Sequence, residues 1–456
     1  MTRRLRTFLL PLLGALLPGV AAVQSSGPAA PSPAGVTLSR LADVPLTRGQ
    51  TAGLDGVLGR ASGFRLGLLI ADAQTGRTLY ARQPDGLYTP ASNMKLLSLG
   101  AALSVLGPDY WFSTSVTRPH GAGGHAGHLT LVGGGDPSLE ASLGEHSLAG
   151  LARQVYAGGL RSVGDLRLDA HLIGAAAGQG EAGWKVPVVE RPVSGLTLND
   201  PSAGEGAELT TTPDTRAALL RLGAAFRSEL ERAGVKVSGT LLLGPPDGPP
   251  EEGVATTRSA PLIGLVRSAM KRSDNVWTEQ LYARLGVNTQ TPEWRPASPR
   301  QARSQEALFL GRAGVSAAGL VIRDGSGLSA EDRLTPRALV GLLRSVYLHP
   351  VGSALAPGAA FRARKNLLIE ALPRAGTGTA SRADALLGGT LATRLKGLDV
   401  RAKTGTLPGV SALSGFLSTQ AGRVLVFSVL MDGYAGPGQE LRQLQDALLR
   451  ALAADS

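Results

Sequence analysis

Cysteine is absent from this chain of 456 residues, and aromatic residues (4%), histidines (6) and lysines (7) are scarce. Without cysteine the protein has no disulfide, no thiol nucleophile and no lipid anchor on a cysteine. The histidines are scattered except for His120, His125 and His128, which we expect to lie on a flexible glycine-rich loop. The sequence therefore predicts neither a metal site nor a cofactor.

The chain is basic, but it lacks the features of a nucleic-acid-binding protein. Its formal charge is +11, and subtracting the three arginines of residues 1–22 leaves +8. A basic surface suits either nucleic acid or an anionic cell envelope. The arginines are dispersed, and no basic helix or row of aromatic residues accompanies them. An envelope location explains the charge more simply, and no nucleic-acid partner is expected.

Residues 1–22 have the pattern of a secretory signal peptide. Three arginines precede an apolar run at 8–20, and small residues follow it. The run is too short and too rich in proline and glycine for a good membrane span. Residues 23–36 are rich in Ser, Pro, Gly and Ala, which predicts a flexible linker. We therefore expect an exported protein of the periplasm or cell envelope, with no transmembrane span in the mature chain.

Ser92 and Lys95 are the first candidates for chemistry. They are three residues apart at a proline-led helix start, so both side chains lie on one helix face. The apolar run at 96–106 predicts a buried helix, which would lower the pKa of the lysine and make it a base for the serine. A second such pair, Ser268 and Lys271, lies beside other basic residues and is interpreted as a solvated helix face.

Two further motifs follow downstream, Ser273-Asp274-Asn275 and Lys403-Thr404-Gly405. Lysine is rare here, with 7 residues against 39 arginines, so a lysine that opens the one Lys-Thr-Gly triplet is informative. Each motif is weak alone. The order Ser-x-x-Lys, Ser-x-Asn, Lys-Thr-Gly is nevertheless the set found in penicillin-binding proteins and class A β-lactamases.

Hydrophobic patterning predicts an α+β protein with a discontinuous catalytic domain. Strands at 65–71 and 78–82 form a hairpin before the Ser92 helix, and further strands follow the third motif. The block between the first two motifs alternates helices and strands, which indicates an inserted α/β accessory domain. We expect the catalytic domain to consist of residues 37–116 and 258–456, and the inserted domain of residues 117–257.

Six segments resemble one family in both sequence and order. They are 90–95, 134–137, 237–241, 273–275, 324–328 and 401–407. On these segments the chain resembles a low-molecular-mass (class C) penicillin-binding protein of the D-alanyl-D-alanine carboxypeptidase/endopeptidase family, peptidase family S13. The resemblance implies a β-lactamase/transpeptidase-like domain, with an antiparallel sheet flanked by helices. It also implies cleavage of peptidoglycan stem peptides ending in D-Ala-D-Ala, with β-lactam antibiotics as covalent inhibitors.

The resemblance also implies roles for the catalytic residues. Ser92 would attack the carbonyl of the penultimate D-alanine, and neutral Lys95 would take its proton. Ser273 would relay a proton to the leaving amine, and Asn275 would hold the substrate amide. Lys403 would bind the terminal carboxylate, and its charge would further lower the pKa of Lys95.

Substrate binding is implied for the rest of the third motif. Thr404, Gly405 and Thr406 would line the carboxylate site on the strand that carries Lys403. The backbone N–H groups of Ser92 and Thr406 would form the oxyanion hole.

The sequence departs from the family in the insertion. The interval from Thr197 to Thr215 is short, which predicts a reduced accessory domain. Family members carry an aspartate shortly after the tryptophan that matches Trp184, whereas residues 185–189 contain no acid and Glu190 comes next. The preferred stem-peptide diamino acid is therefore left open.

Two other functions were weighed. A class A β-lactamase needs a glutamate-bearing loop shortly after Ser273-Asp274-Asn275, and no Glu-x-x-Leu-Asn follows it. The 181 residues between Ser92 and Ser273 also exceed that family's spacing. A catalytically silent wall-binding protein on the same fold is the second alternative, and three intact motifs argue against it.

Overall fold

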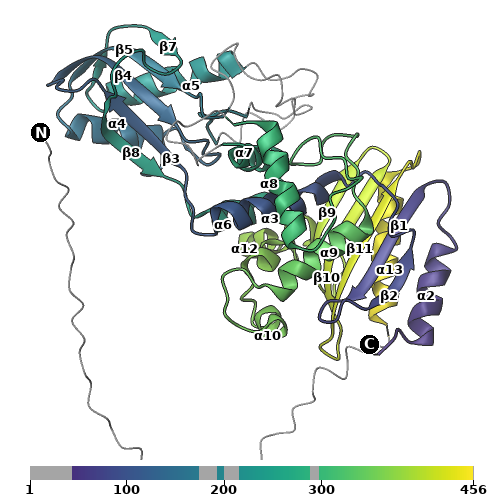
Figure 1. Cartoon of the computed structure of the whole chain (residues 1–456). Coiled ribbons are helices and arrows are strands. Elements are labelled where there is room, and N and C mark those ends of the chain that lie inside the picture. The colour runs from purple at the N-terminus through teal and green to yellow at the C-terminus, as the bar shows by residue number, and fades with distance from the viewer. Residues whose placement is uncertain (1–43, 174–192, 200–214, 288–296, 455–456) are drawn as a thin grey trace, which may run out of the picture.

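The structure is a computed structural model, and it describes residues 44–173, 193–199, 215–287 and 297–454 (Figure 1). The expected signal peptide, the linker and the segment at 184–190 lie outside these ranges. Within the described ranges, no helix combines the length and apolarity needed to cross a membrane.

Five antiparallel strands form the first sheet, in the order β2-β1-β11-β10-β9. These strands are β1 (Arg65–Asp72), β2 (Thr78–Arg82), β9 (Asp399–Leu407), β10 (Val410–Ser418) and β11 (Val424–Asp432). β1 pairs with β11 over its whole length, with Arg65 opposite Asp432 and Asp72 opposite Leu425. The first and last strands of the described chain are therefore neighbours, and the predicted hairpin of β1 and β2 is confirmed.

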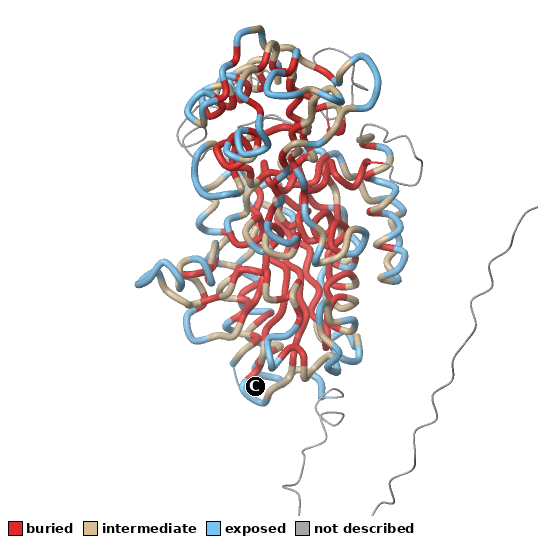
Figure 2. The backbone as a smooth tube through the Cα atoms, turned by 90° about the vertical axis from the view of Figure 1, so that its left-hand side faces the viewer, coloured by how far each residue is buried: buried red, intermediate tan, exposed pale blue. Residues whose placement is uncertain are grey.

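Helices cover both faces of this sheet (Figure 1). Because side chains alternate along a strand, Leu69 and Val426 face one helical layer while Ile70 and Phe427 face the other. The first layer contains α3 (Met94–Leu106), α6 (Leu262–Arg272), α9 (Pro336–Leu348) and α11 (Leu367–Ala371). The second contains α2 (Arg48–Leu58) and α13 (Gly438–Ala453). Figure 2 shows buried backbone running through the sheet between the layers.

A second, mixed sheet lies beyond these layers and has its own hydrophobic core. Its elements are β3 (Ser113–Arg118), β4 (His125–Gly133), α4 (Leu148–Ala157), β5 (Ser162–Asp169), α5 (Thr215–Arg232), β6 (Lys236–Val237), β7 (Leu241–Leu243) and β8 (Glu252–Arg258). β4 and β5 are parallel and are connected through α4, as in a βαβ unit. The expected α+β fold class is confirmed, while the domain boundaries at 117 and 257 stay a prediction.

The remaining helices surround the first sheet. They are the 3-10 turn η1 (Ala91–Asn93), α7 (Asn275–Leu285), α8 (Pro299–Arg312), α10 (Pro357–Arg362), α12 (Arg382–Gly388) and the 3-10 turn η3 (Gly389–Leu391). α3 packs against α7 and α8, and η1 packs against β9 and β10. The elements that carry the three motifs therefore meet at one edge of the sheet.

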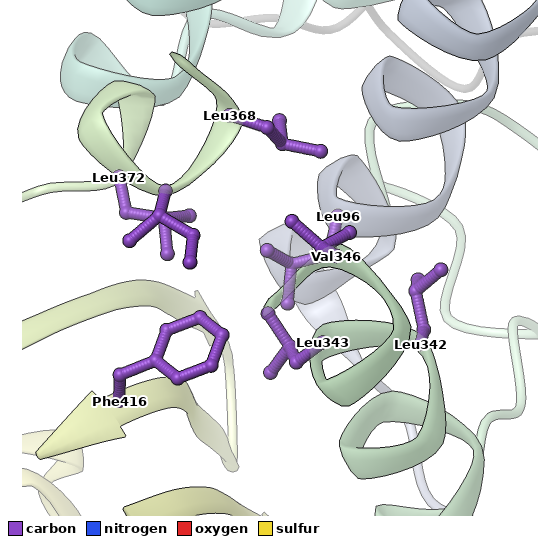
Figure 3. A pocket seen from close by; sticks show the side chains of 8 residues that line it. Leu96, Leu342, Leu343, Val346, Leu368, Leu372 and Phe416 are labelled. Carbon is purple, nitrogen blue, oxygen red and sulfur yellow. The ribbon is translucent and has the colours of Figure 1, made fainter. Parts of the chain in front are cut away.

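A small apolar cavity of about 10 Å³ lies between α3, α9, α11 and β10 (Figure 3). Leu96, Val346 and Phe416 are among its lining residues. A cavity of this size barely accommodates one water molecule, and its walls offer few polar partners. The layer behind the Ser92 helix is therefore closely but not perfectly packed.

Two local expectations were wrong. His125 and His128 lie on β4 rather than in a flexible loop, because pairing with β5 orders this glycine-rich segment. Lys271 is buried, because its helix face packs against the chain near Leu372 and Leu387, whose carbonyls accept hydrogen bonds from its amine.

Candidate active site

The turn that carries Ser92 is short and strained. Residues Ala91–Asn93 form one turn of 3-10 helix that leads directly into α3. Ala91 has φ of +46°, in a region that residues with a Cβ rarely adopt. Ser92 is partly exposed, whereas Asn93 and Lys95 are fully buried. The candidate nucleophile is thus accessible on a buried support.

Lys95 connects this turn to two other segments. Its Nζ lies 2.9 Å from Ser92 Oγ, 2.7 Å from Asn275 Oδ1 and 2.8 Å from the Ser326 carbonyl oxygen. A neutral amine can donate its two N–H groups to the last two acceptors and direct its lone pair at the Ser92 hydroxyl. This is the geometry of a serine activated by a lysine base.

The pKa of Lys95 suits the same role. Burial lowers it to about 8, although the carboxylates of Glu279, Asp324 and Asp274 act in the opposite direction. The expected desolvation of this lysine is therefore confirmed. At Lys403, burial lowers the pKa well below its usual range, and the charge of Lys95 lowers it further. The two amines repel each other, so the site resists holding both as cations.

The Ser273-Asp274-Asn275 turn separates α6 from α7. Ser273 ends α6 in the left-handed conformation, with φ of +59°. Asp274 caps α7 by accepting a hydrogen bond from the Trp277 N–H at 2.9 Å. Asn275 is the first residue of α7, which places its side chain against Lys95. The motif therefore divides the helical segment at 262–285 into two helices.

Lys403 lies on β9 and is fully buried. Its Nζ donates to Ser273 Oγ at 2.8 Å and to the Thr404 carbonyl at 2.8 Å. The third motif thus contacts the second, just as Lys95 joins the first to the second. The structure brings together five residues singled out from the sequence: Ser92, Lys95, Ser273, Asn275 and Lys403.

β9 approaches the Ser92 turn closely at Gly405. A Cβ on this residue would lie 2.8 Å from the Pro90 carbonyl oxygen and 3.0 Å from the Ser92 nitrogen. Asn93 Nδ2 donates to the Lys403 carbonyl at 3.1 Å and so ties the turn to the strand. No sequence pattern indicates this role for Asn93, because the partner lies 310 positions away.

The threonines of the third motif lie at the open side of the site. Thr404 Oγ1 donates to Thr390 Oγ1 at 2.7 Å, and Thr406 is exposed. An open hollow of about 870 Å³ begins at Thr406 and extends to Tyr434 and Arg442. Substrate binding by Thr404, Gly405 and Thr406 stays a prediction.

Several buried groups around Lys95 were missed from the sequence. Glu279 and Asp324 both act on the pKa of Lys95, and Ser326 contacts its amine. Glu279 follows Asn275 by four residues and therefore shares its helix face, a signal that the sequence did contain. In the described part of the chain, no group of three or more His, Asp or Glu side chains is arranged to hold a metal ion.

A family model described as the D-Ala-D-Ala carboxypeptidase 3 (S13) family matches residues 54–187 and 185–454. The chain belongs to this family. Membership of the S13 family confirms the family and the enzyme class that the six segments implied.

Two curated relatives are similar over most of their length. A D-alanyl-D-alanine carboxypeptidase of Actinomadura sp. (strain R39) is 31% identical, with 85% of this chain and 81% of the relative covered. Carboxypeptidase DacB of Mycolicibacterium smegmatis is 30% identical, with 93% and 88% covered. Both relatives are therefore similar to most of this S13 protein.

A solved structure supports the fold. Penicillin-binding protein 4 from Haemophilus influenzae superposes with a TM-score of 0.66 at 21% identity. The superposition covers 88% of this chain and 99% of that structure. At this identity the likeness concerns the fold alone, and it confirms the β-lactamase/transpeptidase-like architecture expected for an S13 protein.

Proposed function

We propose that this chain is a serine-type D-Ala-D-Ala carboxypeptidase, which cleaves peptidoglycan stem peptides through an acyl-enzyme on Ser92. The observation that carries the proposal is the 2.9 Å approach of Lys95 Nζ to Ser92 Oγ, beside the contact between Lys403 and Ser273. The activity named for the Actinomadura relative supports the choice of substrate.

Substrate binding begins at Lys403. The terminal carboxylate of the stem peptide docks near its amine, with Thr404 and Thr406 as further donors. In the free site the pKa of Lys403 is lowered, chiefly by burial. An incoming carboxylate favours the protonated amine and so raises this pKa again. The site therefore takes up a proton as it binds its anionic substrate.

Acylation follows at Ser92. Its Oγ forms a bond to the carbonyl carbon of the penultimate D-alanine, and the hydroxyl proton passes to Lys95 Nζ. The developing oxyanion is held by the backbone N–H groups of Ser92 and Thr406. Gly405 supports this arrangement, because its lack of a side chain lets β9 approach the Ser92 turn.

The acyl-enzyme forms when the peptide C–N bond breaks. The proton that Lys95 took from Ser92 passes to the leaving D-alanine amine through the hydroxyl of Ser273, which the Lys403 amine contacts, so Lys95 is neutral again. Water then adds to the ester carbon with Lys95 as base, and the shortened stem leaves Ser92 in its original state. A cross-linked stem has the same acyl group, so endopeptidase cleavage would proceed through the same intermediate.

We also propose that β-lactams acylate Ser92 and that the protein acts outside the cytoplasm. A β-lactam amide reacts with the same nucleophile, but the leaving nitrogen stays attached to the adduct. The leader-like sequence at 1–22 and a peptidoglycan substrate both support an extracytoplasmic location.

Intact-protein mass spectrometry after incubation with benzylpenicillin tests the proposal. The mature wild-type chain should gain one drug mass, and Ser92→Ala should gain none. Ser268→Ala is the matched control, because it removes the serine of the other Ser-x-x-Lys pair. Release of D-alanine from a pentapeptide stem should show the same dependence on Ser92.

Other outcomes would favour the alternatives. Rapid hydrolysis of the drug without a lasting adduct would indicate a β-lactamase. A folded wild-type protein with neither adduct nor turnover would contradict the proposal and indicate a silent wall-binding protein.

A further inference from the structure

Four carboxyl groups are buried near one another, two of them act on the charge of Lys95, and the reaction described above uses none of the four. They come from α7, α8 and the loop before α9, and each is at most 2% exposed: Glu279, Glu306, Asp324 and Asp332. Burying a carboxylate is costly unless hydrogen bonds or charges compensate for it. The hydrogen bonds that each group accepts therefore indicate its role.

Glu279 holds the turn at residues 324–327. Its Oε1 accepts hydrogen bonds from the backbone N–H of Ser326 at 2.6 Å and of Gly325 at 3.1 Å. Its Oε2 lies 3.2 Å from the same Gly325 nitrogen. A carboxylate that accepts backbone N–H groups makes charge-assisted bonds, which are stronger than neutral ones.

The other side of this turn faces the nucleophile. The Ser326 carbonyl accepts from Lys95 Nζ at 2.8 Å, and the Gly325 carbonyl accepts from Ser98 Oγ at 2.6 Å. At Gly327 a Cβ would lie 1.9 Å from the Ala91 carbonyl oxygen, so the turn lies directly against the strained residue before Ser92. A shift of the turn would therefore move the acceptor that orients Lys95.

Asp324 has a different task from Glu279. It accepts the N–H groups of Gly327 at 2.6 Å and Ser329 at 2.7 Å, both from its own loop. Asp324 thus shapes the turn internally, whereas Glu279 fixes the turn to α7. Glu306 lies on α8 and accepts from the Tyr282 hydroxyl at 2.9 Å, so it does not hold the turn, although it is close enough to Glu279 for the two charges to interact.

We propose that Glu279 is a positioning residue for acylation. It holds the 324–327 turn so that the Ser326 carbonyl directs Lys95 Nζ at Ser92, and its negative charge favours the protonated form of Lys95. The inference rests on the proposed function, because it treats Lys95 as the base for Ser92.

The charges around Glu279 determine the sign of the expected effect. Lys95 faces it from α3, Asp324 and Asp332 from the loop, and Glu306 from α8. Burial and the charge of Asp324 raise the pKa of Glu279 to about 7, against the N–H groups that lower it. Removing the Glu279 charge leaves the Lys95 ammonium less stable, so the pKa of Lys95 falls and the neutral base is present at lower pH.

The test is the rate of acylation by benzylpenicillin, measured between about pH 5 and 9 for the wild type and three variants of the mature chain. Glu279→Gln keeps an acceptor for the turn and should move the rising limb of the profile to lower pH by about one unit. Glu279→Ala removes the acceptor and should slow acylation about 100-fold, the loss typical of a misplacement of 1 Å. Glu306→Gln is the matched buried control and should retain the wild-type profile.

The results distinguish the role of Glu279 from the acylation of Ser92 itself. A wild-type profile for Glu279→Gln, or an equal shift for Glu306→Gln, would overturn the inference while acylation of Ser92 stands. If Glu279→Ala does not fold, the Glu279→Gln profile decides alone. A wild-type chain that benzylpenicillin does not acylate would overturn both this inference and the proposed function.

Discussion

Lys95 and Lys403 are fully buried in a chain that otherwise prefers arginine, with 7 lysines against 39 arginines. An arginine stays charged at any accessible pH, whereas a buried lysine can lose its proton. A base for Ser92 must be neutral before it can accept a proton. Position 95 therefore needs a lysine rather than an arginine, because only the lysine can become a neutral base.

The pH dependence of acylation follows from Lys95. The reactive form is the neutral amine, whose population rises as the pH passes upward through the pKa of about 8. We expect the rate of acylation by benzylpenicillin to rise with pH, with a midpoint near this value. A stopped-flow or quench series across the range measures it, and a rate that falls from pH 7 to 9 would contradict the assignment.

Replacing the base tests the same assignment in another way. Lys95→Met should slow acylation by about 10²- to 10⁴-fold, the usual contribution of a general base. Lys271→Met is the matched control, because burial also lowers the pKa of Lys271 to about 8 but its amine contacts two carbonyls outside the site. Comparable losses in both variants would show that the effect is structural.

At the scale of elements, the contact between β9 and the Ser92 turn decides the site. Gly405→Ala would place a Cβ 2.8 Å from the Pro90 carbonyl oxygen, so the strand and the turn must separate. We expect about a 100-fold slower acylation, as for other small misplacements of reacting groups. Gly253→Ala on β8 is the control, since its Cβ meets nothing within 4 Å. Equal rates in the two variants would contradict this role.

The small cavity behind α3 predicts a stabilising substitution. Val346 lines it, and Figure 3 shows this side chain pointing toward the other lining residues. Val346→Ile should fill part of the space and raise the free energy of unfolding by about 0.5–1 kcal/mol, as cavity-filling changes commonly do. Denaturant unfolding measures the change. Val340→Ile, on the same helix but away from the cavity, should give no gain.

On the scale of the whole molecule, segments near both ends of the described chain form the first sheet. The strands of the second sheet come between these segments in the sequence. Pairing of β1 with β11 closes this arrangement, and the ion pair between Arg423 and Asp72 lies where the two strands meet. The two atoms are 2.9 Å apart, and the side chains are 10% and 3% exposed. The pair therefore fastens segments that are distant in the sequence.

Breaking this pair should destabilise the fold without changing the chemistry. Asp72→Ala leaves a buried guanidinium without its carboxylate, which costs about 3–5 kcal/mol. Asp85→Ala breaks an exposed pair with Arg337 and should cost about 0–1 kcal/mol. Thermal or denaturant unfolding compares the two. Similar losses would show that the Asp72 pair does not fasten the strands, and acylation at a permissive temperature should stay normal in both.

The sequence by itself determined the features that depend on local patterns. The spacing of Ser92 and Lys95 puts them on one helix face, and an apolar run followed by a turn and a returning strand defines β1 and β2. The helix break at Ser273 and the helix at α13 follow from turn residues and from 3.6-residue periodicity. The order of six short segments, which include the three motifs, was sufficient to indicate the S13 family.

Only the tertiary structure decided which groups meet across long separations. Asn275 reaches Lys95 from 180 positions away, and Asn93 reaches the Lys403 carbonyl from 310. Burial of Lys271 was misjudged for the same reason, since exposure depends on what packs against a helix and not on the helix's own sequence. Glu279 holds the turn beside Lys95 because three separate segments pack into one buried region. Desolvation and hydrogen bonding in this region determine the pKa of the base.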